Sequence, residues 1–546
     1  MLLGQSKYWL KGDEEMNIQR KTIGSVFLLL AVSLLPVTAQ ATGYTWTGTT
    51  SNAWNTNTNW NPSTAYPNSY SDQATISGSS GTNKPGVLNS TVLLGIASGT
   101  ALTTSGTSAL SPLDIQLTGL LGMQGNISNS RSSGSGTEKI TIEGTLRNDA
   151  ATAGTVYTIS GSNGSVGLSG GVISSQNGGI WSFGQAVNGY GTISAPFTNT
   201  SVITSNTSGQ TLHITGSSTA AGSLACSISG AFLSLEAALS GVTISNHTGE
   251  IDLNGATLNG FTINNSGTGP INVTGDSTLS GTLTRNSNTP ITLNGHTFTM
   301  NGVTISNVSG GTASIAVGTG TLNVANTLSS MSNGDPITVA GGSIISTAGG
   351  TFNNSGQIIG YGTVSVPVTN VSSGVIRASG GRLALTAPVT TSGTTMLANG
   401  VSGDILDLRS TVTATTSAWL YPNPSGNPGN GEMRFNDATI NGPTGVGQTV
   451  TLGQGAVNVT DDSAVSGNMT SNAALTITSG KELSAEDSTF TNTSLGTVNN
   501  NGGTAAWGNF TNSGTYISTM STQTFNTLTI TNGSVTIGDG DLYQVN

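Results

Sequence analysis

Residues 251–275 read IDLNGATLNGFTINNSGTGPINVTG, and residues 291–295 open the same phrase again as ITLNG. Two aliphatic residues flank one other residue, and a glycine follows two positions later. Alternating aliphatic residues place their side chains on one face of a β-strand. The Asn, Gly and Ser clusters that follow are typical of turns. This stretch therefore predicts short strands joined by tight turns.

The aliphatic phrase recurs along the chain at a nearly constant spacing. Its leading residues are Leu233, Ile251, Ile271, Ile291, Ile315 and Ile337, whose sequence numbers differ by 18, 20, 20, 24 and 22. A period of about 20 residues in a sequence of β type indicates a solenoid, in which each coil stacks on the one before it. We predict an all-β fold, a right-handed parallel β-helix with about 20–22 residues in each coil.

A longer repeat supports the solenoid. Gly170–Asn199 and Gly341–Asn370 align without a gap at an offset of 171 in sequence number, and 14 of their 30 positions are identical. Such an offset corresponds to about eight coils, so we interpret the two segments as copies of one ancestral block.

Residues 16–41 have the organisation of a secretory signal peptide. Basic residues precede an apolar run over 23–35, and Ala39 and Ala41 form an A-x-A cleavage site, which predicts a mature chain that starts at Thr42. The apolar run is shorter than the ~20 residues of a membrane-spanning helix. We expect an exported protein, extracellular or at a bacterial cell surface, with no transmembrane helix in the mature chain.

Residues 1–15 are polar and precede the predicted signal peptide. Because a signal peptide stands at the N-terminus of its chain, we interpret these residues as an over-extended start and Met16 as the initiator.

The charge of the mature chain argues against polyanionic partners. Beyond residue 41 there are 21 acidic and 10 basic residues, a net charge of about −11. Such a chain repels nucleic acids, so we expect no nucleic-acid partner. Charged residues make up only 7% of the sequence, and Ser, Thr, Asn and Gly must therefore cover the surface.

The residues that most often hold metals are few and scattered. Cys226 is alone, and its place in a Leu-Ala-Cys strand pattern predicts that it points into the core. His213, His247 and His296 have no metal-ligand spacing, and we expect all three at the surface. The sequence predicts no metal site and no cofactor.

Aromatic and acidic residues follow the predicted cleavage site: Tyr44-Thr-Trp46-Thr-Gly48, Trp54, Asn59-Trp60, Pro67 and Asp72-Gln-Ala74-Thr-Ile76. This spacing resembles the start of bacterial exported β-helix proteins, namely autotransporter passengers and exosortase-sorted (PEP-CTERM) surface proteins. The resemblance implies a tryptophan-rich cap and first coils over 42–80, and a passenger-like rod over 81–546. The cap would cover the open end of the first coil, and the alternative role for its tryptophans is to stack on sugars.

Residues 377–437 hold four of the ten basic residues of the mature chain, interspersed with aspartates. The arginines and aspartates of this region are Arg377, Arg382, Asp404, Asp407, Arg409, Arg434 and Asp437. Asp404 follows Arg382 by about one coil, so we expect the two to stack on one face. One interpretation is a polysaccharide lyase or glycosidase. Its catalytic residues would be Arg382, Asp404, Asp407 and Arg409. The interpretation that we favour is salt-bridged decoration without a catalytic residue.

A Pro- and Gly-rich loop excursion over 419–434 lies within this region. Trp419 and Tyr421 stand at its beginning, and we consider them candidate ligand contacts, because aromatic faces stack on sugars.

Scattered Thr-x-Thr phrases, such as Thr527-Leu-Thr529 and Thr282-Leu-Thr284, raise the question of an ice-binding face. Such a face needs the phrase at matching positions in successive coils, and the variable coil length argues against it. We expect instead a non-enzymatic adhesin-like or matrix-like rod. Its Ser-, Thr- and Asn-rich surface would contact a glycan, a cell-surface ligand or a second copy by many weak hydrogen bonds.

Overall fold

The computed structural model describes residues 42–546, with gaps at 78–86, 107–112, 117, 132–138, 246–247, 266–268, 286–288, 308–313, 329–335, 372, 393–394, 399–400 and 423–430. The predicted over-extended start, the signal peptide and its cleavage residues Ala39 and Ala41 therefore lie outside the described residues, as do His247 and most of the predicted loop excursion.

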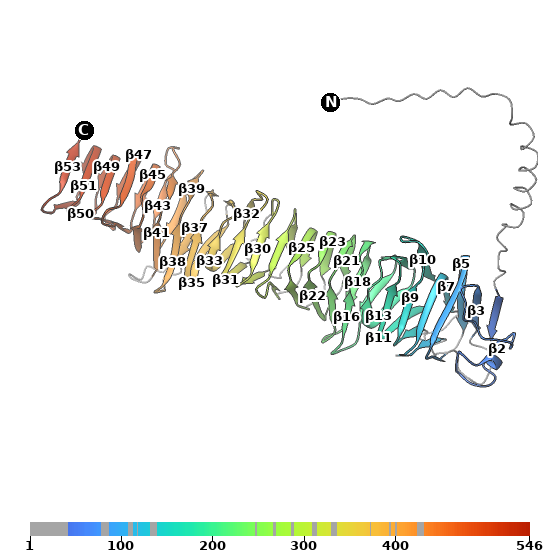
Figure 1. Ribbon diagram of the computed structural model, residues 1–546. Coiled ribbons are helices and arrows are strands. Elements are labelled where there is room, and N and C mark those ends of the chain that lie inside the picture. The colour runs from blue at the N-terminus through green and yellow to red at the C-terminus, as the bar shows by residue number, and fades with distance from the viewer. Residues whose placement is uncertain are drawn as a thin grey trace, which may run out of the picture. The chain divides into compact units, whose positions relative to one another are not determined.

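By its internal contacts the chain divides into two units, Met1–Thr42 and Gly43–Asn546. In the described part of the second unit, β-strands follow one another, and the one helical element is a short 3-10 turn, η1 (Asn57–Asn59) (Figure 1). The first two, β1 (Thr42–Trp46) and β2 (Trp60–Asn61), pair antiparallel, and the strands of the coils that follow pair in parallel. Among the described residues, no helix combines the length and the apolar character needed to cross a lipid bilayer.

Strands of successive coils pair in parallel, and the aliphatic phrase sets their register. Leu233 pairs with Ile251, and the ladder continues through Ile271, Ile291, Ile315 and Ile337. The strands that carry it are β19 (Phe232–Leu235), β22 (Glu250–Asn254), β24 (Ile271–Gly275), β26 (Ile291–Thr292), β29 (Ile315–Gly318) and β31 (Pro336–Ile345). All six side chains are buried. The predicted parallel solenoid is confirmed.

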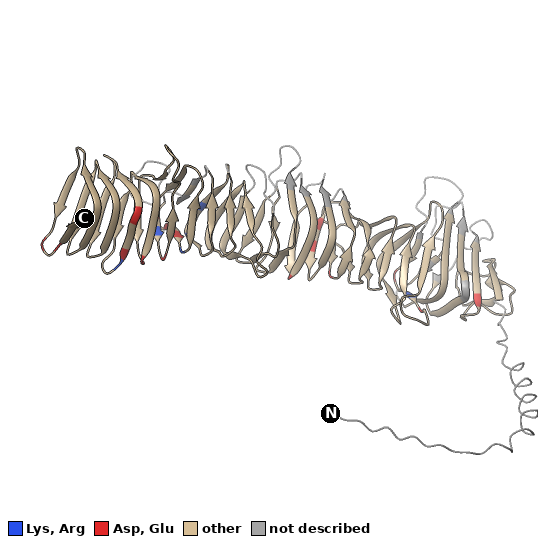
Figure 2. Ribbon diagram, turned by 90° about the horizontal axis from the view of Figure 1, so that it is seen from above, with Lys and Arg blue, Asp and Glu red and all other residues tan. Residues whose placement is uncertain are grey.

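The core and the surface of the coils follow strand alternation. In β22, Ile251 and Leu253 are buried and Asp252 between them is half-buried on the outer side. Apolar side chains from successive coils form one continuous core along the unit. Most of the ribbon carries neither acidic nor basic residues (Figure 2). The outer surface is therefore covered mainly by uncharged polar side chains, as the composition predicts.

The two copies of the long repeat adopt the same strands. β13 (Ala186–Ile193) and β33 (Gln357–Val364) begin and end at equivalent positions of the repeat, and so do β14 (Phe197–Asn199) and β34 (Val368–Asn370). At one corner of each copy, Gly189 and Gly360 have φ angles of 123° and 130°. A Cβ atom there would lie 1.9 Å from the carbonyl oxygen of Leu168 or 1.8 Å from that of Val339. Both corners therefore require glycine.

A tryptophan cluster occupies the N-terminal end of the second unit. Trp46, Trp54 and Trp60 are each 1% exposed, and their rings meet edge to face at centroid distances of 5.0 and 4.6 Å around Trp60. Trp60 Nε1 donates to the Trp54 carbonyl at 2.8 Å, and Trp54 Nε1 donates to that of Pro67 at 3.0 Å. Because no ring face is open to solvent, this cluster packs the end of the solenoid and leaves no surface for a sugar.

Buried asparagines link neighbouring coils from the inside. Asn354 donates to the Asn370 side chain at 2.7 Å, and Asn492 donates to that of Asn512 at 2.8 Å. A primary amide both donates and accepts, so these contacts between neighbouring coils fix the register of the strands above and below, although Asn492 Oδ1 is buried without a hydrogen-bond partner.

Candidate functional site

Some of the charged residues of 377–437 form an ion-paired cluster on, or directly beside, three successive strands. These are β35 (Val375–Leu385), β38 (Asp404–Leu408) and β41 (Gly431–Phe435), which pair in that order. The Asp407 side chain is fully buried, and its Oδ2 accepts hydrogen bonds from Arg382 Nε at 2.8 Å and Arg409 Nε at 2.6 Å. Its Oδ1 accepts from Asn436 Nδ2 at 3.2 Å. We call this set the Asp407 cluster; its carboxylate has all its partners within the protein.

A second pair continues the cluster on the next coil. Arg434 forms a forked contact with Glu432, Nε to Oε1 at 2.6 Å and Nη2 to Oε2 at 3.0 Å, and Asn458 also donates to Oε1 at 2.9 Å. Burial acts to raise the pKa of the Glu432 carboxyl. The hydrogen bonds from Arg434 and Asn458 outweigh it and hold that pKa below its usual value. Glu432 is therefore ionised and engaged at neutral pH.

Asp404 does not stack on Arg382. Arg382 is in register with Ile405, the residue after Asp404. Asp404 therefore points to the same side of the strand as the core-facing Leu406. Asp404 Oδ1 instead accepts from the Gly380 N–H at 2.7 Å, and its Oδ2 is buried without a hydrogen-bond partner. A one-residue difference in coil length moves a side chain to the other face of a strand.

The two remaining charged residues stay outside the cluster. Arg377 Nε is buried without a hydrogen-bond partner. Asp437 is exposed just after β41, with a φ angle of 59° that suits a tight turn. The structure therefore brings together Arg382, Asp407 and Arg409, with Arg434 beside them, and leaves Asp404, Arg377 and Asp437 apart.

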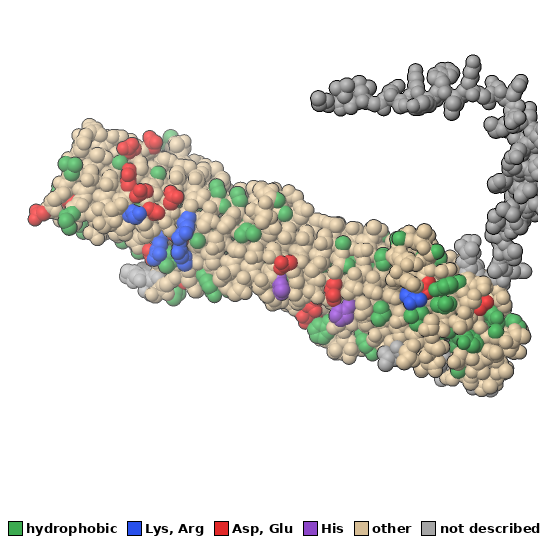
Figure 3. Space-filling view, viewed as in Figure 1, with side chains coloured by type: hydrophobic (Ala, Val, Ile, Leu, Met, Phe, Trp, Pro, Cys, Tyr) green, Lys and Arg blue, Asp and Glu red, His purple; other side chains and the backbone are tan. Residues whose placement is uncertain are grey.

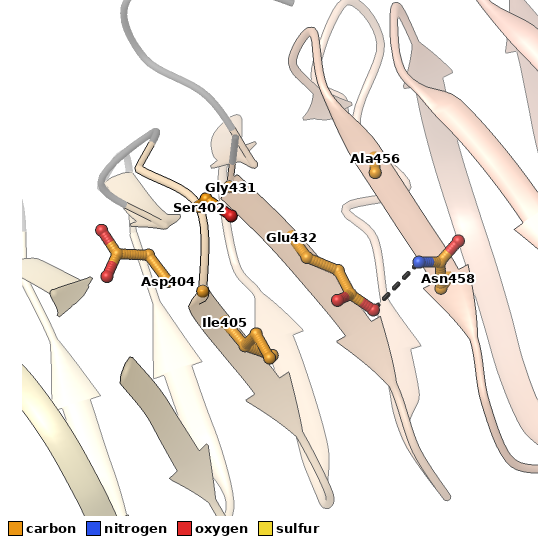
Figure 4. Close-up of a pocket in the computed structure, with 8 residues that line it drawn as sticks. Ser402, Asp404, Ile405, Gly431, Glu432, Ala456 and Asn458 are labelled. Atoms are coloured by element: carbon orange, nitrogen blue, oxygen red, sulfur yellow. Dashed lines mark hydrogen bonds between the residues drawn. The ribbon is translucent and has the colours of Figure 1, made fainter. Parts of the chain in front are cut away.

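A shallow hollow of about 280 Å³ lies beside the cluster. It is lined by Ser402, Gly403, Asp404, Ile405, Gly431, Glu432, Ala456 and Asn458. In Figure 4 the Glu432 carboxylate lies along the hollow and meets Asn458, whereas the Asp404 carboxylate points away from Glu432. The two carboxylates do not converge on one point, as an acid and a base for glycoside cleavage would.

Trp419 and Tyr421 lie on β40 (Ala418–Tyr421), on the outer face of the coil. Their rings stack at an interplanar angle of 2° and a centroid distance of 5.1 Å, and Trp419 is 41% exposed. A Cβ atom on Gly453 of the following coil would lie 1.9 Å from the Tyr421 ring, so that ring rests directly on the Gly453 backbone. The two side chains form a supported aromatic platform, of which Trp419 is the more exposed member.

Sequence reasoning missed a second charged group, on β16 (Thr211–Ile214), β19 and β22. Glu236 Oε1 meets His213 Nδ1 at 2.7 Å and accepts from Ser234 at 2.7 Å, and Asp252 follows Ser234 in register. Burial raises the pKa of Asp252 to about 6, and the neighbouring Glu250 carboxylate adds to the rise. On the face drawn in Figure 3, histidine side chains lie beside acidic ones.

A signal for this group was present in the sequence. Glu250-Ile-Asp252 places two carboxylates on the outer side of one strand, about one coil after Ser234-Leu-Glu236. Among the described residues, no three His, Cys, Asp or Glu side chains are arranged to hold a metal ion. Cys226 is fully buried, as predicted, and burial raises the pKa of its thiol to about 11.

No protein-family model matches the chain, and no curated protein matches it at a significant level.

Proposed function

We propose that the protein is a non-enzymatic, exported or cell-surface solenoid, adhesin-like or matrix-like, that contacts glycans through its outer face. The right-handed coil and the likeness to autotransporter passengers and exosortase-sorted surface proteins belong to this proposal. The observation that carries it is the Trp419–Tyr421 platform, an aromatic surface on the outside of a solenoid whose outer side chains are mostly uncharged.

The platform has the properties of a sugar contact. The C–H groups of a sugar pack on an aromatic face, and the surrounding hydroxyl and amide groups supply hydrogen bonds. Tyr421 stacks on Trp419 and rests on Gly453, so both rings are held before a ligand arrives. Preorganisation of this kind lowers the entropic cost of binding.

The alternative, a lyase or glycosidase around 377–437, has less support. The Asp407 carboxylate is fully buried, and its oxygens accept hydrogen bonds from Arg382, Arg409 and Asn436. The Glu432 carboxylate accepts hydrogen bonds from Arg434 and Asn458. A general base must reach a substrate proton directly or through one water. We therefore assign these residues to stabilising the coils.

The test is retention of the full-length protein on neutral and acidic polysaccharides, with product release measured in parallel. We expect the wild type to be retained on at least one neutral polymer and Trp419→Ala to lose this retention. Tyr361→Ala, which removes another exposed aromatic ring of the outer surface, should be retained as well as the wild type. Equal retention of Trp419→Ala and the wild type would reject the platform. Product release that disappears in Arg382→Ala would favour the enzymatic alternative.

A further inference from the structure

Threonines form an uninterrupted column on the outer face of the last coils. Thr470, Thr491, Thr511 and Thr529 are successive register partners. They lie on β45 (Ser463–Ser471), β47 (Glu482–Asn492), β49 (Thr504–Asn512) and β51 (Thr522–Ile530). Figure 1 shows these strands side by side toward the C-terminus.

A second column runs parallel to the first, two residues earlier in each strand. Its members, also successive register partners, are Asn468, Thr489, Asn509 and Thr527. We call the eight residues of both columns the threonine face. Each of them is exposed or half-buried, and none is charged. The strands keep one register across the face, because their bulges lie before it.

The backing of this face holds it rigid. Phe490 and Phe510 lie between the two columns in sequence and point to the inner side. Their rings stack with a centroid distance of 5.6 Å and an interplanar angle of 5°. Beside them the Asn492 amide donates to that of Asn512 at 2.8 Å. Stacked rings and an amide column fix neighbouring strands relative to each other, so the outer side chains keep a constant spacing.

The spacing of the grid suggests its ligand. Neighbouring coils lie about 4.8 Å apart and residues i and i+2 of a strand about 6.6 Å apart, so the face presents a nearly rectangular lattice of hydroxyl, methyl and amide groups. Water oxygens on the prism plane of hexagonal ice repeat in a rectangle of similar dimensions. Threonine hydroxyls join such a water layer by hydrogen bonds, and the methyl groups between them order the water that they exclude.

We propose that the threonine face binds ice. The inference is independent of the glycan contact proposed above, because it uses other coils and other side chains. It also departs from the expectation drawn from the sequence, because Thr489-Phe-Thr491 and Thr527-Leu-Thr529 lie in one register with two Asn-x-Thr phrases, at Asn468 and Asn509. Coils of slightly different length still align here, because the register shifts of β45 and β47 come before the face and the pairing after them is continuous.

The experiment measures ice growth in the presence of the full-length protein, as inhibition of recrystallisation in frozen sucrose solution and as the shape of single crystals in an osmometer. We expect the wild type to restrain grain growth and to produce faceted crystals. The variant Thr491→Leu with Thr511→Leu should lose both effects, because two bulky side chains at the centre break the lattice and remove its hydroxyls.

The matched control is Thr497→Leu with Thr515→Leu. These threonines are also half-buried register partners, on β48 (Thr497–Asn501) and β50 (Thr515–Thr519), another face of the same coils. The control should keep full activity, and both double variants should melt within a few degrees of the wild type. A folded wild type without effect on ice would overturn the proposal, and so would equal loss of activity in the two double variants.

Discussion

A single carboxylate, that of Asp407, joins the outer surfaces of neighbouring coils. Arg382 lies on the preceding coil, and Asn436 follows β41 on the next. A buried carboxylate is stable only when hydrogen-bonded cations or amides surround it, whereas the two arginines are each 40% exposed and keep contact with water. The cost of disrupting the cluster therefore depends on which partner is removed.

Replacement of Asp407 by alanine should lower the free energy of unfolding by about 2 kcal/mol, because it removes the acceptor of several charge-assisted hydrogen bonds. Urea denaturation followed by circular dichroism measures the change. Asp461→Ala, which removes an exposed carboxylate paired with Lys481, is the control and should change the midpoint little. A larger effect of Asp461→Ala than of Asp407→Ala would contradict the role given to burial.

Asp252 predicts a pH dependence of opposite sign to that of an ordinary ion-paired carboxylate. Its pKa of about 6 in the fold lies above the ordinary value of about 3.9. The fold therefore favours the neutral form, and this contribution to stability is present below pH 4 and lost as the pH rises through 6. Asp252→Asn should raise the melting temperature by a few degrees at pH 8 and leave it nearly unchanged at pH 4.

Thermal melts of both proteins at the two pH values give the comparison. Asp276→Asn is a suitable control, because this carboxylate is 74% exposed beside His296. If Asp252→Asn raised the melting temperature equally at pH 4 and pH 8, ionisation of Asp252 would not be the cause of the increase.

At the scale of the strand, glycines allow the chain to adopt the positive φ angles and the close backbone contacts that a coil requires. Gly360 combines a φ angle of 130° with a Cβ position that overlaps the Val339 carbonyl. Gly255 has a φ angle of 74° but open space around its Cβ position. The two positions separate the cost of backbone strain from that of a steric overlap.

Gly360→Ala should therefore destabilise the protein by more than about 3 kcal/mol, because the backbone of the neighbouring coil must move. Gly255→Ala should cost only about 1 kcal/mol, the strain of a left-handed alanine. Chemical denaturation of the two variants side by side tests the difference, and similar losses of stability would show that the overlap is relieved elsewhere.

Strands were easier to predict than the contacts between their outer side chains. The core positions of the ladder from Leu233 to Ile337 could be read from the sequence, because the aliphatic alternation marks them in each coil. The register partner of Arg382 could not be read from the sequence. Arg382 pairs with Ile405, whereas a coil one residue shorter would have paired it with Asp404. Corner lengths vary without a clear sequence signal, and each extra residue exchanges the two faces of a strand.

The molecule as a whole behaves as a stack of units that interact with their neighbours. Removal of residues 251–270 would join Glu250 to Ile271 and bring Leu233 into register with Ile271, as it is now with Ile251. We expect this variant to keep the β-sheet circular dichroism spectrum and to melt within a few degrees of the wild type. Removal of residues 251–260 alone deletes half a coil, and this variant should not fold cooperatively. Cooperative melting of both deletion variants would contradict the register argument.

The inner asparagines also bear on how the protein ages. Deamidation begins when the backbone nitrogen of the following residue attacks the side-chain amide. After Asn492 and Asn512, those nitrogens belong to Thr493 and Ser513, which donate to the carbonyls of Ser471 and Asn492 on the coil before. The amide carbon and its attacker are thus held apart in a rigid lattice, and these sites should resist chemical decay for as long as the coils stay stacked.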